Sequence, residues 1–262
     1  MSPSGFYAWR KRAESMRAKE DKVLLQGISQ IYWASQGRYS SPRVYQALKR
    51  KGFLISRKRV ERLMRVAGLV ARCVKVVRYA PKLKRFQQAG SNLLLEMNEP
   101  TGCNQVWVGD VTYLKLNGRW QYLSTVMDVY SRRIIGWSLS DHRRTELTLA
   151  SLDHALRRRG KPEKLVFHSD RGIEYLSYEF KDELARNGIK QSFNRAGHCG
   201  DNAFMESFFH TLKGELIRKS KYRNVKALRH ALSGYINGFY NRVRIHSSIG
   251  YLSPIQYEQR YA

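Results

Sequence analysis

The strongest constraint on the fold is a pair of strand-like segments joined by the dipeptide Asn117-Gly118. Residues 105–116 and 120–127 are rich in β-branched and aromatic side chains, which favour extended strands. The pair Asn-Gly favours a two-residue type I′ turn, whose twist suits two antiparallel strands. The sequence therefore predicts a β-hairpin, and the apolar character of its first segment predicts a strand buried on both faces.

Strand-like and helix-like segments alternate after this hairpin. Three further strands are predicted over residues 134–139, 165–167 and 189–193. Helices are predicted over 145–159 with Thr145 as its cap, over 177–187, from about 203 onwards, and over 225–240. Three antiparallel strands followed by this alternation predict an α/β fold with a mixed five-stranded sheet.

Three carboxylates occupy positions where acids are unusual or useful. Asp110 lies inside the first predicted strand, where a buried carboxylate is costly unless a partner such as a metal ion compensates it. Asp170 follows a short apolar strand, at the place where α/β sheets present site residues. Glu206 lies on the helix that begins near residue 203. Each acid alone is readily explained as structural, but the three together indicate a site.

The helix that carries Glu206 has two different stripes. Its apolar stripe consists of Met205, Phe208, Phe209, Leu212 and Leu216, and its polar stripe consists of Asn202, Glu206, His210 and Lys213. Asp201 or Asn202 is predicted to cap the first turn, because a short side-chain oxygen accepts hydrogen bonds from free backbone N–H groups. The alternative for the polar stripe is a face that is simply solvated.

The spacing of the three acids is the first of several family features. Between Asp110, Asp170 and Glu206 lie 59 and then 35 residues, which resembles the D,D(35)E pattern of transposases and retroviral integrases. The segments 108–114, 126–137, 168–172, 201–209 and 240–254 resemble those of one bacterial insertion-sequence family. In that family the transposase is encoded in two overlapping frames, and this chain resembles the second-frame product. Arg171 departs from the usual Gln and Gly200 from the usual aromatic residue.

The resemblance implies a ribonuclease-H-like core of the integrase type and a DNA transposase activity. It implies cleavage at the element ends and strand transfer by attack of a 3′-hydroxyl, with two Mg²⁺ ions held by Asp110, Asp170 and Glu206, and with Mn²⁺ as a substitute. Phosphodiester chemistry of this kind needs an entering and a leaving oxygen to be stabilised, and Mg²⁺ prefers carboxylate oxygens. A DNA-binding regulator without catalysis and a structure-selective nuclease are the alternatives.

The charge of the chain points to a polyanionic partner. The sequence has 48 Lys and Arg residues against 21 Asp and Glu residues, a net charge of +27, and residues 1–91 contribute 22 of these cations and 4 of these acids. In this segment Ser40 and Ser56 are predicted to cap two short helices that end at Gly52 and Gly68. The two helices resemble a helix-turn-helix unit, and the alternative is a solvated basic helix pair.

Several basic residues are therefore predicted to contact DNA. They are Arg57, Lys58, Arg59 and Arg62 on the second short helix, Arg242 and Arg244 in a tail predicted to be irregular and to expose His246 as well, and Lys213 and Asn202 beside Glu206. The expected partners are the terminal inverted repeats, target DNA, further copies of this chain, and possibly the first-frame protein. No membrane partner is expected, and the expected location is the bacterial cytoplasm in association with the nucleoid.

The predicted organisation has four parts. These are a basic helical region at 1–70, a basic linker at 71–97 expected to be poorly ordered without DNA, a catalytic core at 98–220, and a C-terminal helix and basic tail at 221–262. Cys73, Cys103 and Cys199 lack C-x-x-C spacing and are interpreted as reduced thiols. The histidines at 168, 198, 210 and 246 are interpreted as structural or DNA-facing rather than as metal ligands, and Asp128 as the cap of a turn.

Overall fold

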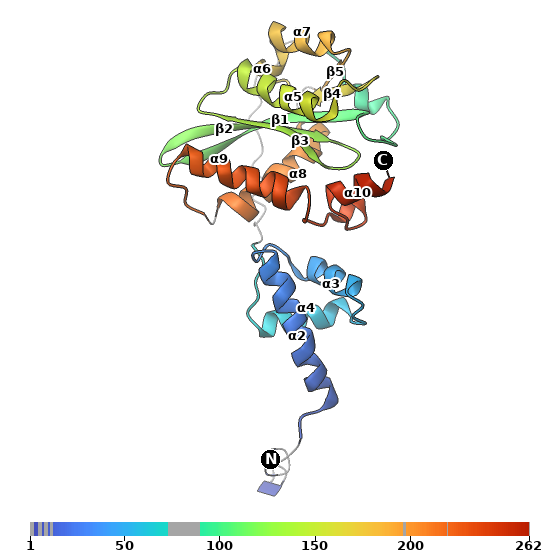
Figure 1. Cartoon of the computed structure of the whole chain (residues 1–262), viewed down its shortest axis with the longest axis vertical. Coiled ribbons are helices and arrows are strands. Elements are labelled where there is room, and N and C mark those ends of the chain that lie inside the picture. Colours follow the sequence, from blue (N-terminus) through green and yellow to red (C-terminus); the bar gives the residue numbers. More distant parts are fainter. Residues whose placement is uncertain are drawn as a thin grey trace. The chain divides into compact units, whose positions relative to one another are not determined.

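The chain forms two compact units, Met1–Cys73 and Val74–Ala262, in a computed structural model (Figure 1). The structure describes residues 13–72, 90–195, 198–218 and 220–261, together with residues 3, 4, 7 and 10. Most of the basic linker predicted at 71–97, and Cys73 with it, lies outside the described residues. The two units are described separately.

The residues described between positions 13 and 72 form a small helical bundle of α2 (Met16–Ala34), α3 (Ser41–Arg50) and α4 (Arg57–Val66). Its core consists of side chains from all three helices: Leu24, Ile28, Ile31, Val44, Leu48, Val60, Leu63 and Met64. The predicted cap at Ser56 is confirmed, because its hydroxyl accepts a hydrogen bond from the amide of Arg59. Ser40 precedes α3 as predicted, but its side chain forms no capping bond.

The second unit is built on a five-stranded sheet in the order β3-β2-β1-β4-β5. The strands are β1 (Val106–Leu116), β2 (Arg119–Asp128), β3 (Ile134–Ser140), β4 (Val166–Ser169) and β5 (Lys190–Phe193). The first three strands are antiparallel, whereas β4 pairs in parallel with β1 and with β5, so the predicted mixed sheet is confirmed. Both Asn117 (φ 47°) and Gly118 (φ 83°) have positive φ, as a type I′ turn requires.

Helices cover both faces of this sheet (Figure 1). On one side lie α5 (Thr145–Arg159), α6 (Ile173–Leu176) and α7 (Tyr178–Arg186), and on the other lie α8 (Ala203–Leu212) and α9 (Val225–Ser233). The core between the sheet and α5–α7 includes the fully buried rings of Trp107, Phe167 and Phe180. Thr145 is the first helical residue of α5 rather than its cap, which is Arg144.

The C-terminal segment is more regular than the sequence predicts. The α8 helix continues as a π-helical segment over Lys213–Ile217, α9 continues as another over Gly234–Tyr240, and the chain ends in α10 (Pro254–Tyr261). Asn241 joins this segment to β3, since its side-chain amide donates to the carbonyl of Ile134 and its side-chain oxygen accepts from the amide of that residue. The prediction of an irregular tail was therefore wrong for Pro254–Tyr261, which form α10, whereas most of residues 241–253 lie in turns and loops. No helix in the described part of the chain is long and apolar enough to cross a membrane.

Candidate active site

Asp110 and Asp170 lie next to each other because two parallel strands end together. In the β1–β4 pair Val108 lies opposite His168. Asp110 comes two residues after Val108 on one strand, and Asp170 comes two residues after His168 on the other. This is the carboxyl edge of the parallel pair, where α/β sheets place their sites. Gly109 precedes the first acid because a Cβ atom there would lie 2.5 Å from the ring of Phe167.

The two carboxyl groups oppose each other's ionisation. Burial raises the pKa of Asp110 to about 8, and the charge of Asp170 adds to the rise. Burial also raises the pKa of Asp170. Asp110 accepts a hydrogen bond from the amide of Val111 at 2.7 Å and Asp170 from the amide of Gly172 at 3.0 Å, but neither forms an ion pair with a described basic side chain. Two adjacent half-buried acids without a bound cation have the chemistry of a metal site.

A third acid near this pair is already neutralised. Glu174 on α6 is fully buried and accepts hydrogen bonds from Arg143 Nε at 2.8 Å and from Arg143 Nη2 at 2.6 Å. Its other oxygen, Oε2, is buried without a hydrogen-bond partner among the described residues. The charge of Glu174 raises the pKa of Asp170, and that of Arg143 lowers it. Sequence reasoning missed Arg143, since no local pattern pairs it with an acid 31 positions away.

Glu206 lies on α8, and the start of this helix is attached to β1 beside Asp110. The side-chain amide of Asn202 donates to the carbonyl of Gly109 at 3.1 Å. β4 is paired with β1 only as far as Val108, so this hydrogen bond is made just beyond the paired segment. Glu206 follows Asn202 by four residues, and residues at this spacing lie on one side of a helix. Its side chain is exposed.

The structure brings together two of the three predicted metal ligands. Among the described residues, no group of three or more His, Cys, Asp or Glu side chains is close enough to hold a metal ion. Asp110 and Asp170 form the pair, and Glu206 stands apart from it on α8. The donors that are present are carboxylate oxygens, which fit Mg²⁺ or Mn²⁺.

The α8 helix confirms the predicted apolar stripe and corrects the predicted cap. Met205, Phe208, Phe209, Leu212 and Leu216 are buried as predicted. Asn202 is the cap residue by position, but its side chain makes no capping bond because it is used on Gly109. Asp201 does not cap either, since it pairs with Arg195 at 2.9 Å and accepts from Asn92. Burial leaves Asn202 inaccessible, so the prediction that it contacts DNA is not supported by its position.

Lys213 follows α8 and lies against an aromatic ring rather than an acid. Its ammonium group is 4.8 Å from the centroid of the Tyr113 ring on β1. Burial lowers the pKa of Lys213, and the charge of Asp110 partly opposes this shift. The Lys213 side chain therefore lies near both the Tyr113 ring and Asp110.

Other polar residues that could be taken for ligands have structural partners. The ring nitrogens of buried His168 lie 2.9 Å from Ser192 Oγ and 2.7 Å from Asn194 Oδ1, which agrees with its structural interpretation. Buried Asp128 accepts from the amides of Asn104 and Ser131, so its predicted capping role is confirmed. Burial raises the pKa of the Cys103 thiol to about 12, which leaves it protonated and unreactive.

Some of the basic side chains predicted to contact DNA are exposed, and others are paired with acids of the protein. Arg57, Lys58 and Arg242 are exposed. Arg59 is instead bound to Asp21 and Glu20 of α2, and the exposed Arg62 also pairs with Asp21, so these arginines hold α4 against α2.

The prediction that Arg244 and His246 are exposed is wrong, because both side chains are buried. The guanidinium of Arg244 binds Glu215 at 3.0 Å and lies 3.2 Å from the ring nitrogen of His246. An exposed Arg244 that contacts DNA was therefore a wrong expectation. The sequence shows that Arg244 is charged, but it does not show that the partner of this charge is Glu215, 29 positions away.

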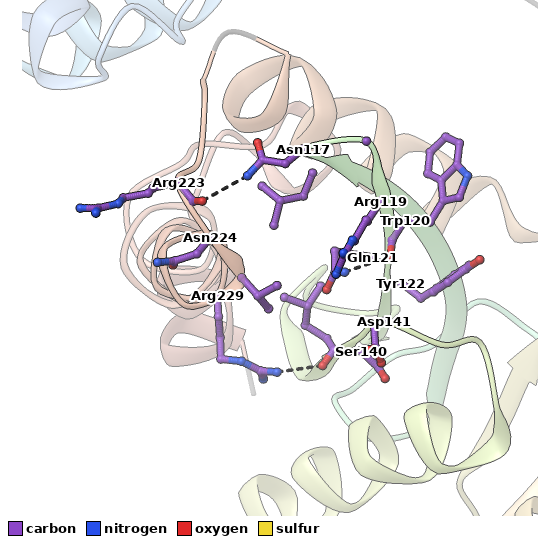
Figure 2. Close-up of a pocket in the computed structure, with 14 residues that line it drawn as sticks. Asn117, Arg119, Trp120, Gln121, Tyr122, Ser140, Asp141, Arg223, Asn224 and Arg229 are labelled. Carbon is purple, nitrogen blue, oxygen red and sulfur yellow. Dashed lines mark hydrogen bonds between the residues drawn. The ribbon is translucent and has the colours of Figure 1, made fainter.

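A cavity of about 1060 Å³ lies at the end of the β1–β2 hairpin, and none of the three acids lines it (Figure 2). Its lining includes three arginines, Arg119, Arg223 and Arg229, and one acid, Asp141. Asn117 in the hairpin turn donates to the carbonyl of Arg223, which precedes α9, and Arg229 on α9 donates to the carbonyl of Leu139 on β3.

Comparisons with known proteins agree with this architecture. Residues 100–199 and 206–261 match models of an integrase core domain, and residues 18–76 match the model of an HTH-like domain. The simian T-cell lymphotropic virus intasome, solved in complex with PP2A regulatory subunit B56 gamma, is similar in fold with a TM-score of 0.53 at 14% identity, over 88% of this chain and 74% of that chain. The fold and the site therefore define an integrase-core protein with an HTH-like module, and the predicted ribonuclease-H-like core is confirmed.

Full-length relatives define the family more narrowly. The chain is 35% identical to the transposase InsF for insertion sequence IS3A of Escherichia coli (strain K12), over 98% of this chain and 90% of that protein. It is 33% identical to the insertion element IS600 uncharacterized 31 kDa protein of Shigella sonnei, over 100% of this chain and 96% of that protein. This chain belongs to the IS3-type family of insertion-sequence transposases.

Proposed function

We propose that this transposase cleaves phosphodiester bonds at the ends of its element and joins them to target DNA through attack by a 3′-hydroxyl. The observation that carries the proposal is the pair of adjacent carboxyl groups of Asp110 and Asp170, which no described basic side chain neutralises. Membership of the transposase family supports this activity over a regulator without catalysis or a structure-selective nuclease.

The chain's acids are assigned to hold two Mg²⁺ ions, with Mn²⁺ as a substitute. Two bound ions supply activation of the attacking oxygen and stabilisation of the leaving oxygen during in-line displacement at phosphorus. Asp110, on the central strand of the site, would hold these ions together with Asp170 and Glu206. The attachment of α8 to β1 through Asn202 and Gly109 supports the assignment of Glu206, because it fixes the backbone that carries this residue close to Asp110.

The remaining cations bind and orient the DNA. Lys213 is assigned to a phosphate near the reacting end, since it lies seven residues after Glu206 in a continuous helical segment. At ~1.5 Å rise per residue this is roughly 10 Å along the axis, too far to reach the same ion. Arg57 and Lys58 on α4, and Arg242, are assigned to DNA because their side chains are exposed. Arg62 is assigned to DNA as well, since it stays exposed while it pairs with Asp21.

The proposed partners are the terminal inverted repeats and target DNA. We extend the proposal to a homo-oligomer assembled on DNA, with the first-frame protein as a further partner, on the resemblance to two-frame transposases. A protein that acts on chromosomal DNA in this way would be found with the bacterial nucleoid in the cytoplasm.

End cleavage and end joining with Mg²⁺ test the proposal directly. Labelled element ends are incubated with the protein, and the products are sized on a denaturing gel. Asp110→Asn and Asp170→Asn are expected to abolish both products while DNA affinity is kept, since each change removes a ligand oxygen charge without adding bulk. Asp153→Asn, in an exposed pair with Arg157 on α5, is the matched control and should remain active. Near-normal joining by either active-site variant would refute the assignment.

A further inference from the structure

Two aromatic rings are exposed side by side on the β1–β2 hairpin. Tyr113 is 59% exposed and Trp120 is 47% exposed, although their neighbours Leu114 and Leu116 on β1 are buried. Alternate residues of a strand face opposite sides of the sheet, so the hairpin buries its leucines and presents its rings outward. Figure 2 shows Trp120 and Tyr122 projecting from one side of β2 and Arg119 from the cavity side.

The strand register places these rings together with two cations. Lys115 lies opposite Trp120, and Tyr113 lies opposite Tyr122, so Tyr113 and Trp120 are diagonal neighbours. Their ring centroids are 5.2 Å apart with an interplanar angle of 87°. The ammonium group of Lys115 is 5.6 Å from the centroid of Trp120, and that of Lys213 is 4.8 Å from the centroid of Tyr113. We call these four residues the aromatic–basic face.

Hairpin stability alone does not explain this face. Cross-strand aromatic pairs contribute to a hairpin, but exposed rings leave apolar surface in contact with water. Lys115 and Lys213 form no ion pair within the described part of the chain, although both lie beside open aromatic surface. Lys213 comes from the end of α8, so the face is assembled from β1, β2 and the helix of Glu206.

We propose that Tyr113 and Trp120 form a stacking site for an unpaired base of DNA, with Lys115 and Lys213 on the neighbouring phosphates. An aromatic ring offers a stacking surface to any base, and a lysine beside it neutralises the backbone charge. In an intact duplex each base is covered by its neighbours, whereas a single-stranded extension leaves a base open. The proposal rests on the proposed function only in taking DNA as the ligand.

The position of the face fits this role. Tyr113 follows Asp110 by three residues on β1, which is about 10 Å at ~3.3 Å per residue, and strand alternation turns its ring to the face opposite the Asp110 carboxylate. Lys213 connects the two places, because its ammonium group lies 4.8 Å from the centroid of the Tyr113 ring and the charge of Asp110 acts on its pKa. A base held on Tyr113 would therefore belong to a strand that passes Lys213 on its way to the acids. The cavity at the end of the hairpin, whose lining also includes Trp120, adds positive charge, because it is lined by Arg119, Arg223 and Arg229. A polyanion is thus attracted to both parts of the same hairpin.

The test measures binding and stacking separately from catalysis. A duplex with a short single-stranded extension that contains 2-aminopurine is compared with a blunt duplex of the same sequence, with EDTA present so that no cleavage occurs. Stacking on a ring quenches the fluorescence of 2-aminopurine. Trp120→Ala is expected to weaken binding of the extended DNA about tenfold, the size of one lost stacking contact. It should abolish most of the quenching and leave the affinity for the blunt duplex unchanged.

Three further variants keep the test decisive. Trp120→Phe should retain quenching, whereas Trp120→Leu, which keeps an apolar side chain on a folded hairpin, should lose it. Tyr178→Ala removes an 80% exposed tyrosine from α7 and should behave as wild type. Normal quenching by Trp120→Leu, or an equal loss of affinity for both duplexes in Trp120→Ala, would overturn the stacking site. Absence of end cleavage by the wild-type protein with Mg²⁺ would overturn the proposed function instead, and would leave the binding result standing.

Discussion

Replacement of Arg244 by Met should destabilise the second unit strongly without weakening its intrinsic affinity for DNA. The Arg244 side chain is 6% exposed and that of its partner Glu215 is 7% exposed. Arg244 Nη2 donates to Glu215 Oε1 at 3.0 Å and its Nε lies 3.1 Å from both carboxylate oxygens. The hydroxyl of Tyr235 donates to the same carboxylate at 2.8 Å. All of these groups are removed from water.

The magnitude follows from the charge that is left behind. In Arg244→Met, Glu215 keeps only the Tyr235 hydroxyl, and breaking a buried ion pair from one side costs about 3–5 kcal/mol. In the double variant Glu215→Leu with Arg244→Met no buried charge remains, and the replacement of a whole buried pair by apolar groups is often close to neutral. The Tyr235 hydroxyl then lacks its acceptor, which costs about 1–3 kcal/mol. The double variant should therefore be more stable than the single one.

Hydrogen exchange is measured at the backbone amides of the five-stranded sheet, which lies in the second unit. The exchange rates give the free energy of opening of this unit separately from that of the N-terminal unit. DNA affinity is measured in parallel by fluorescence anisotropy under conditions where each variant is folded. Arg242→Ala is the matched control, since Arg242 is exposed two positions earlier. It should leave the exchange rates unchanged and lower DNA affinity, with a reduction of about one in the slope of log K against log salt. An Arg244→Met protein of normal stability and reduced DNA affinity would refute the buried-pair assignment.

Three other perturbations have defined outcomes. Without Mg²⁺, the raised pKa of Asp110 means that stability is lost as pH rises from its ordinary value of 3.8 through about 8. Calorimetric melts should therefore show Mg²⁺ stabilising the protein more at the alkaline end of this range. Asp110→Asn should reduce the pH dependence, and the raised pKa of Asp170 should account for part of what remains. Lys58→Ala should weaken duplex binding at constant melting temperature, whereas Arg59→Ala, which breaks the pairs with Asp21, should lower the melting temperature. Gly136→Ala should lower the free energy of unfolding, measured by urea titration, by about 1–3 kcal/mol. The reason is that the added Cβ atom would lie 2.1 Å from the carbonyl oxygen of Ser151 on α5.

Local patterns in the sequence predict much of the fold, because the forces that form them are local. The turn at Asn117-Gly118 depends on two backbone conformations that these residues tolerate, and both are observed. The bond from the Arg59 amide to Ser56 lies within one helical turn. The apolar stripe of α8 depends only on helical spacing. Each of these features needs a few neighbouring residues and no knowledge of the rest of the chain.

Polar side chains were harder to predict, because their partners are distant in the sequence. Arg59 pairs with Asp21 across 38 positions, and Arg244 pairs with Glu215 across 29. From sequence alone, each of these arginines looks like an exposed cation in a basic protein. Asn202 is a comparable case, because its amide reaches Gly109 across 93 positions. An excess of positive charge predicts a polyanionic partner, but it does not say which cations meet it.

The same distant contacts explain how Glu206 can be exposed and still be held in place. At the start of α8 Asn202 is bonded to β1. On its flank the guanidinium of Arg132, in the turn between β2 and β3, lies 4.0 Å from the centroid of Phe204. Beyond its end Glu215 is fixed by Arg244 from the C-terminal segment.

Glu206 and Lys213 lie between these attachments, so the exposed side chain of Glu206 and the half-buried side chain of Lys213 are carried on a backbone whose position is fixed by the core. This arrangement suits a ligand that completes a metal site only when DNA and ions are present. It also makes the segment after residue 220 part of the same compact unit as α8, because without Arg244 the far end of the helix would carry a buried acid with no basic partner. The match of residues 206–261 to an integrase core model agrees with this dependence.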